Sequence, residues 1–174
     1  PTLKRLFKRD AAQASADAPR GGRFGALADS AVFGVIGALA ADEAPLLGLI
    51  SVLGPIMAMG NRAVLVASEP FPLAALEFVQ VLETSDVPAG VVNILTGAHA
   101  DLASHMAAHA GLDAVWSFSS YPISADIERA RAGNLKRAWV TNALARDWAD
   151  PSSEGRAFLD AATEVKTVWV PYGE

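Results

Sequence analysis

The sequence predicts an α/β domain in which a doubly wound, mostly parallel sheet carries helices on both faces. Short runs rich in β-branched residues alternate with longer stretches of helical periodicity along most of the chain. The longer stretches have the length of helical crossovers, which join neighbouring parallel strands. With 174 residues, 52% of them hydrophobic, the chain can bury one core of ordinary size.

The elements follow one another after a loop marked by Pro19, Gly21 and Gly22. Apolar β-branched runs predict strands, and longer amphipathic or wholly apolar runs that end at glycine, as at Gly60 and Gly133, predict helices. The expected strands are 32–39, 62–68, 91–96, 114–118, 135–141 and 165–170, and the expected helices are 45–59, 72–84, 101–110, 123–132 and 152–163.

We expect residues 1–29 to form a lead-in of helix and loop, and residues 30–174 to form the α/β domain. The net charge of −5 divides unevenly, because residues 1–23 are basic and the remainder carries −9. That acidic remainder repels nucleic acid and anionic lipid, so we expect neither as a partner. The basic start, LKRLFKR, spaces its apolar residues like one face of a helix, which favours a solvated amphipathic helix over a nucleic-acid arm.

The compartment and the extent of the chain also follow from composition. The absence of cysteine excludes disulfides and thiolate chemistry, and it favours the cytoplasm. The most apolar stretch, 44–59, is short for a bilayer span and contains Gly48, Gly54 and Pro55, which predicts a buried helix. We find no signal peptide, and a chain that begins at Pro1 suggests a piece of a longer protein.

The loop after the expected strand 91–96 lies where a glycine-rich phosphate loop would lie in this fold. Its sequence, GAHADLA, contains one glycine, Gly97. The side chains of His99 and Ala103 obstruct the approach of a pyrophosphate, and Asp101 adds a negative charge at the helix start. We therefore expect an ordinary turn with Asp101 as a cap or first-turn acid.

Two histidines, His105 and His109, have the helical spacing at which imidazoles can share a metal ion. No glutamate lies between them, and the third histidine, His99, would have to fold back from its loop. We expect no metal site, and exposed helical histidines instead. Residues 119–121, SSY, form a polar cluster at a strand end, which is typical of an ordinary loop.

Asp42 and Glu43 precede Pro45 at an expected helix start, where carboxylates are stabilised by free backbone N–H groups. We expect them to cap this helix rather than to form an acid–base pair, because no nucleophile or second base lies near them in the sequence. The four tryptophans are expected to be core or interface anchors: Trp116, Trp139, Trp148 and Trp169.

Four segments occur in a familiar order: VFGVIGALAADEAPLL, MGNRAVLVASEPFPLAALEFV, DVPAGVVNILTG and VKTVWV. Together they resemble the coenzyme-binding, Rossmann-like domain of the aldehyde dehydrogenase superfamily, over most of residues 30–142 and the last ten or so. The AADEAPLL turn, AGNLKRAWV, the stretch Arg146 to Trp148 and the ending VWVPYGE look more narrowly like the C-terminal pseudo-dehydrogenase domain of family-16 aldehyde dehydrogenases.

The resemblance implies that the catalytic machinery of the family is missing. Glu43 stands where the Asn of the motif WNFP helps to hold the substrate oxyanion, and a carboxylate repels an oxyanion. Thr141 stands at the general-base Glu of LELGG. Between Thr141 and VKTVWV the family inserts its catalytic domain with the nucleophilic Cys, whereas a short segment without cysteine intervenes here. We expect no catalytic residue and no enzyme activity of this chain alone.

The coenzyme positions implied by the resemblance are mostly changed too. Val66 replaces the ribose-binding Lys of KPSE, while Ser68 and Glu69 match its last two positions. The glycine-rich turn keeps only Gly97, and the FTGS turn becomes a run that ends at Ser120. Glu69, Gly97 and Ser120 are thus the remaining candidates for coenzyme contacts. We expect no cofactor in this chain, with NAD as the cofactor of the parent family.

Three functions are open. The first is a structural or assembly domain at the C-terminal end of a larger NAD-dependent aldehyde dehydrogenase, with the upstream catalytic region or a second copy as its partner. The second is a vestigial nucleotide-binding regulatory module that uses Glu69, Gly97 and the serine turn. The third, an enzyme with new chemistry at Asp42, Glu43 or the histidines, has only generic residues behind it. We favour the first, with an interface along the C-terminal strand, whose edge the missing catalytic domain would leave open.

Overall fold

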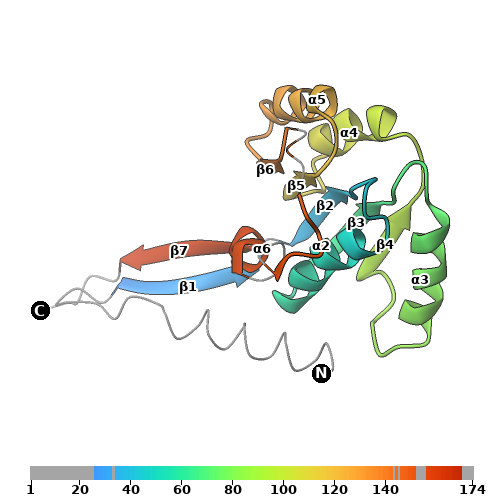
Figure 1. Cartoon of the computed structure of the whole chain (residues 1–174). Helices are drawn as coiled ribbons and strands as arrows, with labels where there is room; N and C mark the ends of the chain where they lie inside the picture. Colours follow the sequence, from blue (N-terminus) through green and yellow to red (C-terminus); the bar gives the residue numbers. More distant parts are fainter. Residues whose placement is uncertain (1–25, 33, 143, 145, 152–155, 170–174) are drawn as a thin grey trace, which may run out of the picture.

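A five-stranded parallel sheet forms the centre of the molecule (Figure 1). The computed structural model describes residues 26–32, 34–142, 144, 146–151 and 156–169. The strand order is β4-β3-β2-β5-β6, and every neighbouring pair is parallel. The strands are β2 (Val35–Leu39), β3 (Arg62–Val66), β4 (Val92–Leu95), β5 (Ala114–Ser117) and β6 (Arg137–Val140).

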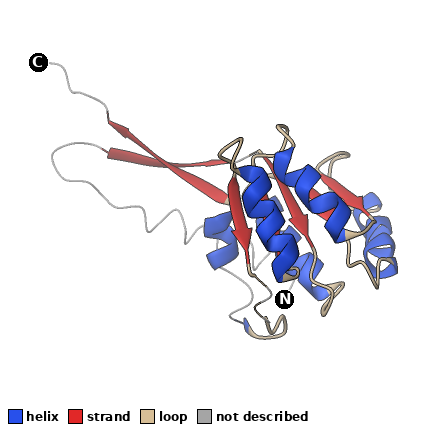
Figure 2. Ribbon diagram, turned by 90° about the horizontal axis from the view of Figure 1, so that it is seen from above, coloured by secondary structure: helices blue, strands red, loops and turns tan. Residues whose placement is uncertain are grey.

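Helices pack on both faces of this sheet (Figure 2). One face carries α2 (Leu47–Ala58), α3 (Leu73–Glu83) and α6 (Arg156–Ala161), and the other carries α4 (His99–Ala108) and α5 (Tyr121–Arg131). Successive strand residues alternate between the two cores, as Val115 and Trp116 of β5 do. The expected doubly wound α/β fold is therefore confirmed.

The apolar helix α2 is buried, as its sequence indicates, with Leu49, Val52 and Ile56 at most 1% exposed. It ends before Gly60, whose φ of +81° lies in the left-handed region that glycine adopts easily. Among the described residues, no helix is long and apolar enough to cross a bilayer. The amphipathic helix expected near the N-terminus lies outside the described residues, as do residues 152–155 of the helix expected at 152–163.

An aromatic cluster fills the core beneath α6. The ring of Phe158 lies 4.8 Å from that of Trp139, and Phe118 lies 5.1 Å from Trp148, measured between centroids. Trp116 and Trp148 are 2% and 3% exposed, which confirms them as core anchors, and the half-buried Trp139 packs against the same core. The side chain of Trp169 lies outside the described residues.

A two-stranded antiparallel ribbon stands away from the sheet (Figures 1 and 2). It consists of β1 (Ala26–Val32) and β7 (Thr163–Trp169), which pair along their whole length. The strand expected at 32–39 is β2 over residues 35–39, but Val32 belongs to the ribbon, because the chain leaves the ribbon and enters the sheet within that apolar run. Gly34 lies at the break with a φ of +120°, and a Cβ there would clash with Asp113 Oδ2.

Side chains at the base of the ribbon fix it to the sheet. Asn61, which is 1% exposed, donates from Nδ2 to the Ala162 carbonyl at 2.7 Å, and its Oδ1 accepts from the Gly34 amide at 3.0 Å. Asp113 Oδ2 accepts from the Val35 amide at 2.8 Å. The end of β1 and the start of β7, which lie together at the base of the ribbon, are thus both bonded to the amino-terminal edge of the sheet.

Lys136, directly before β6, is a buried cation at the C-terminal end of α4. Its side chain is 6% exposed, and Nζ donates to the carbonyl oxygens of Met106 at 3.2 Å and His109 at 2.5 Å. A cation at this end of a helix is stabilised by the helix dipole. Desolvation lowers the pKa of Lys136 below its usual 10.5, and Asp113 opposes that change.

Substitution of Lys136→Met is expected to lower the free energy of unfolding by about 1–3 kcal/mol near neutral pH, because buried carbonyl groups lose their donor. With the folded-state pKa below 10.5, the unfolded chain binds this proton more tightly. The lowered pKa therefore contributes stability that is fully present above pH 10.5 and is lost as pH falls through the folded-state pKa. Urea unfolding at a series of alkaline pH values should show the difference in free energy of unfolding between the two proteins growing as pH rises from the folded-state pKa toward 10.5. A difference that stays constant would contradict the lowered pKa.

Candidate functional site

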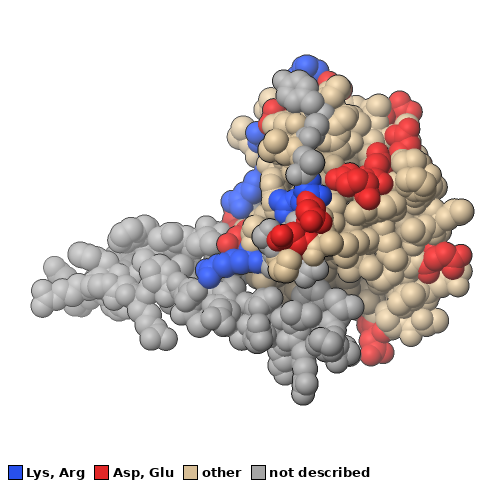
Figure 3. All heavy atoms as spheres, in the orientation of Figure 1, with Lys and Arg blue, Asp and Glu red and all other residues tan. Residues whose placement is uncertain are grey.

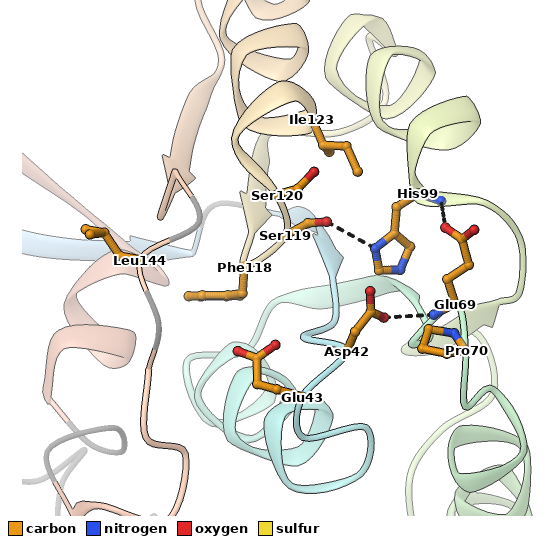
Figure 4. Close-up of a pocket in the computed structure, with 10 residues that line it drawn as sticks. All are labelled: Asp42, Glu43, Glu69, Pro70, His99, Phe118, Ser119, Ser120, Ile123 and Leu144. Carbon is orange, nitrogen blue, oxygen red and sulfur yellow. Dashed lines mark hydrogen bonds between the residues drawn. The ribbon is translucent and has the colours of Figure 1, made fainter.

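The ligand crevice of the fold lies where the strand order reverses. From β2 the chain adds β3 and β4 on one side of the sheet, and then crosses to add β5 and β6 on the other. In doubly wound sheets, ligands bind at the carboxyl ends of the strands at this point. A cavity of about 820 Å³ opens there (Figure 4), lined by Asp42, Glu43, Glu69, Pro70, His99, Phe118, Ser119, Ser120, Ile123 and Leu144.

Asp42 and Glu43 follow β2, and each carboxylate accepts hydrogen bonds from residues far away in the chain. Asp42 Oδ1 accepts from the Ser68 hydroxyl and from the Glu69 amide, both at 2.9 Å. Glu43 Oε1 accepts from Trp148 Nε1 at 3.0 Å. The prediction that these acids cap the following helix is wrong: α2 begins at Leu47, and its first turn has neither an acid nor a side-chain cap. The acids lie too early in the chain to reach the free N–H groups of that turn.

His99 is buried in the floor of the cavity, with 1% of its surface exposed. Its Nε2 lies 2.8 Å from the Ala67 carbonyl oxygen, and its Nδ1 lies 3.4 Å from Ser119 Oγ (Figure 4). Because a carbonyl only accepts, Nε2 carries a hydrogen, whereas Nδ1 and the Ser119 hydroxyl can each donate or accept in their contact. The backbone amide of His99 donates to Glu69 Oε2 at 3.0 Å.

The helix start differs from the expected one. Helix α4 begins at His99 rather than at residue 101, so His99 belongs to the first turn instead of a loop. Asp101 lies in this first turn, as predicted, and Ala98 precedes the helix without a side-chain cap. Sequence reasoning treated His99 as an obstruction but missed its burial, because its partners follow β3 and β5 and lie far away in the chain.

The other histidines lie apart from this cavity. His105 and His109 are exposed, which confirms the prediction of surface histidines. His109 Nδ1 accepts from the Gly111 amide at 3.0 Å. Within the described residues, no three or more His, Cys, Asp or Glu side chains are placed to hold a metal ion.

The positions matched to family motifs are divided between the cavity and its surroundings. Glu69 and Ser120 line the cavity, and Ser120 precedes α5 without a side-chain cap bond. Gly97 is exposed and is not among the lining residues, and Val66 is fully buried at the end of β3. Thr141, just after β6, has its Oγ1 3.5 Å from the Ser117 carbonyl oxygen.

The cavity is acidic. Its described lining contains three carboxylates, Asp42, Glu43 and Glu69, and no lysine or arginine. Residues 24–174 carry a net charge of −9. Acidic side chains lie at several places on the face of the body that Figure 3 shows. Such a field opposes the binding of a dinucleotide pyrophosphate.

This chain is similar to known proteins in both sequence and fold. Residues 8–142 match the profile of the aldehyde dehydrogenase family. The chain belongs to the aldehyde dehydrogenase family. An aldehyde dehydrogenase of Agaricus bisporus is 33% identical over 141 residues, which is 80% of this chain and 27% of that enzyme. The NADP/NAD-dependent aldehyde dehydrogenase PuuC of Escherichia coli is 32% identical over 62% of this chain and 22% of its own length.

Aldehyde dehydrogenase C of Pseudomonas syringae, crystallised as a mutant with NAD⁺ and octanal, superposes with a TM-score of 0.67. It is 27% identical, and the match covers 79% of this chain and 29% of that one. The chain thus spans less than a third of the length of these aldehyde dehydrogenases. The segment they share with it is the α/β domain, so membership of the family establishes the fold and not the activity.

Proposed function

We propose that this chain is a non-catalytic assembly domain, the C-terminal part of a larger NAD-dependent aldehyde dehydrogenase of the family-16 type. Its upstream catalytic region oxidises aldehydes to carboxylic acids, and this domain joins that region, a second copy, or both. We place the protein in the cytoplasm, because a chain without cysteine suits a reducing compartment.

The ribbon of β1 and β7 carries this proposal. The two strands pair with each other through seven residues each. Among the described residues, neither strand pairs with a third, so each has an outer edge of backbone N–H and C=O groups. A two-stranded ribbon alone is at best marginally stable in water, and it gains stability when a partner covers it. A ribbon that stands away from the body is therefore suited to pairing with another chain or domain.

The residues of the cavity support the non-catalytic part of the proposal. The chain has no cysteine to attack an aldehyde, and Thr141, whose hydroxyl cannot act as a base near neutral pH, stands where the family has its general base. The carboxylate of Glu43 bonds to Trp148 at the position where the family has an oxyanion-binding Asn. Each of these changes removes a group on which aldehyde oxidation depends.

A regulatory nucleotide site is the alternative function. It is favoured by the cavity itself, which keeps about 820 Å³ of space beside Glu69 and Ser120. The acidic lining counts against it, because this alternative requires the binding of an anionic ligand.

We expect the purified domain not to bind NAD at physiological concentrations, because the ribose lysine is replaced by Val66 and the cavity is lined with carboxylates. Titration calorimetry with NAD and NADP measures this directly, with an active aldehyde dehydrogenase as the positive control. A micromolar dissociation constant would contradict the assembly proposal and favour the regulatory alternative.

A further inference from the structure

Four aromatic rings surround the guanidinium of Arg146 beside the ligand cavity. Arg146 Cζ lies 5.0 Å from the ring centroid of Phe158, 5.6 Å from that of Trp148, 5.7 Å from that of Trp139 and 5.8 Å from that of Phe118. A cation within about 6 Å of an aromatic centroid is attracted by the ring, and cages of several rings bind organic cations. We infer that these four rings, the aromatic cage, form a binding site for a small organic cation of the guanidinium or ammonium type, which Arg146 occupies in this structure. This inference goes beyond the proposed assembly function.

The aromatic cage is fixed before any ligand arrives, because its rings belong to the hydrophobic core. Phe118, Trp148 and Phe158 are buried, and the half-buried Trp139 packs against the same core. The rings also hold one another in tilted and edge-to-face contacts, with centroids 4.8 to 6.3 Å apart. A preorganised site loses little conformational freedom when it binds a ligand. Arg146 is only half-buried, so its guanidinium can leave the cage while the core stays packed.

The aromatic cage adjoins the acidic cavity. Phe118 lines the cavity and points toward Leu144, another lining residue (Figure 4). Glu43 also lines the cavity, and its Oε1 accepts from Trp148 Nε1 at 3.0 Å. This carboxylate adds a negative charge beside the rings, which strengthens the attraction of a cation. Because the described lining contains no lysine or arginine, the electrostatic field of the cavity also favours the entry of cations.

Arg146 competes with any free cation for the aromatic cage. It lies in the connection between β6 and α6, two residues before Trp148 of the same cage. A tethered group of this kind has a high effective concentration at its site. We therefore expect the wild-type domain to bind a free cation weakly, and removal of Arg146 to reveal the affinity of the cage.

Calorimetric titration of Arg146→Ala with n-propylguanidinium chloride tests the site. This probe supplies the group that the variant lacks, and n-propylurea has nearly the same shape without the charge. We expect n-propylguanidinium to bind Arg146→Ala at least tenfold more tightly than it binds the wild-type domain, and at least tenfold more tightly than n-propylurea binds the same variant. Arg129→Ala removes an arginine of α5 whose side chain is 77% exposed, and this matched control should bind like the wild-type domain.

Two results with an Arg146→Ala protein that is folded by circular dichroism would overturn the inference. The variant could bind n-propylguanidinium no better than Arg129→Ala does, which would show that the rings form no cation site. It could instead bind n-propylurea as tightly as n-propylguanidinium, which would show that the rings are only an apolar surface. Neither result bears on assembly, which sedimentation tests separately.

A chemical variant decides the question if Arg146→Ala does not fold. The chain has no cysteine, so Arg146→Cys carries a single thiol. This thiol can be alkylated with a trimethylammonium-ethyl group or with the neutral 3,3-dimethylbutyl group, which has the same shape. The cationic adduct should unfold at a higher urea concentration, because only this adduct places a charge among the rings. Two adducts of equal stability, or a cationic adduct that is the less stable of the two, would overturn the inference.

Discussion

The double variant Val168→Lys/Trp169→Ala is expected to sediment with a lower mass than the wild-type protein, when both are made with the upstream region. Both changes fall in β7, one of the two strands of the ribbon. A standard interface buries about 800 Å² per partner, and one aromatic anchor can contribute ~2 kcal/mol or more to its stability. Loss of such an anchor and introduction of a charge should weaken association at least tenfold, which analytical ultracentrifugation resolves.

A matched control distinguishes an interface from general damage. Val81→Lys places the same charge at a valine of α3 that is 57% exposed, on the body of the domain away from the ribbon (Figure 1). This variant should keep the wild-type mass. If the ribbon variant also keeps the wild-type mass and solubility, the interface lies elsewhere and the ribbon does not carry assembly.

The substitution Phe158→Ala is expected to have the largest effect on stability, with a loss of about 3–5 kcal/mol in the free energy of unfolding. Phe158 is fully buried, and its ring lies 4.8 Å from Trp139 and 6.1 Å from Trp116. The Arg146 guanidinium lies 5.0 Å above the same ring. Helix α6 has six residues and is too short to be stable without this contact. Urea denaturation followed by tryptophan fluorescence measures the loss.

Phe71→Ala serves as the control for this experiment. Phe71 is 58% exposed, so its truncation should change the free energy of unfolding by no more than about 0.5 kcal/mol. If Phe158→Ala and Phe71→Ala have similar effects, the aromatic cluster is not the anchor of α6.

The sheet could be predicted from the sequence because each of its strands is a short apolar run between clear helix ends. The ribbon could not be predicted in the same way. Residues 32–39 form one apolar run, and hydrophobicity alone does not show where a chain passes from one sheet to another. The signal that was available is Gly34, which lies inside that run and adopts a φ of +120°.

The site was predicted less well than the fold. Its place at the carboxyl ends of the strands followed from the topology, and the exposed histidines followed from their helical spacing. The role of Asp42 and the burial of His99 could not be predicted from the sequence, because their hydrogen-bond partners come from other loops. Glu69 and His99 are 30 residues apart, and only the parallel order of β3 and β4 brings them together.

Because the ribbon is long and extends from the turn at Gly34, a small rotation of the backbone at Gly34 produces a large displacement of the far end of the ribbon. Seven residues at about 3.3 Å each give a strand of about 23 Å, so a rotation of about 10° at Gly34 would move the far end by about 4 Å. That displacement is nearly the ~4.8 Å spacing between paired strands. A side chain at position 34 that tilted the ribbon by this much would therefore displace its far end by nearly one strand spacing, while the sheet and its core stayed unchanged.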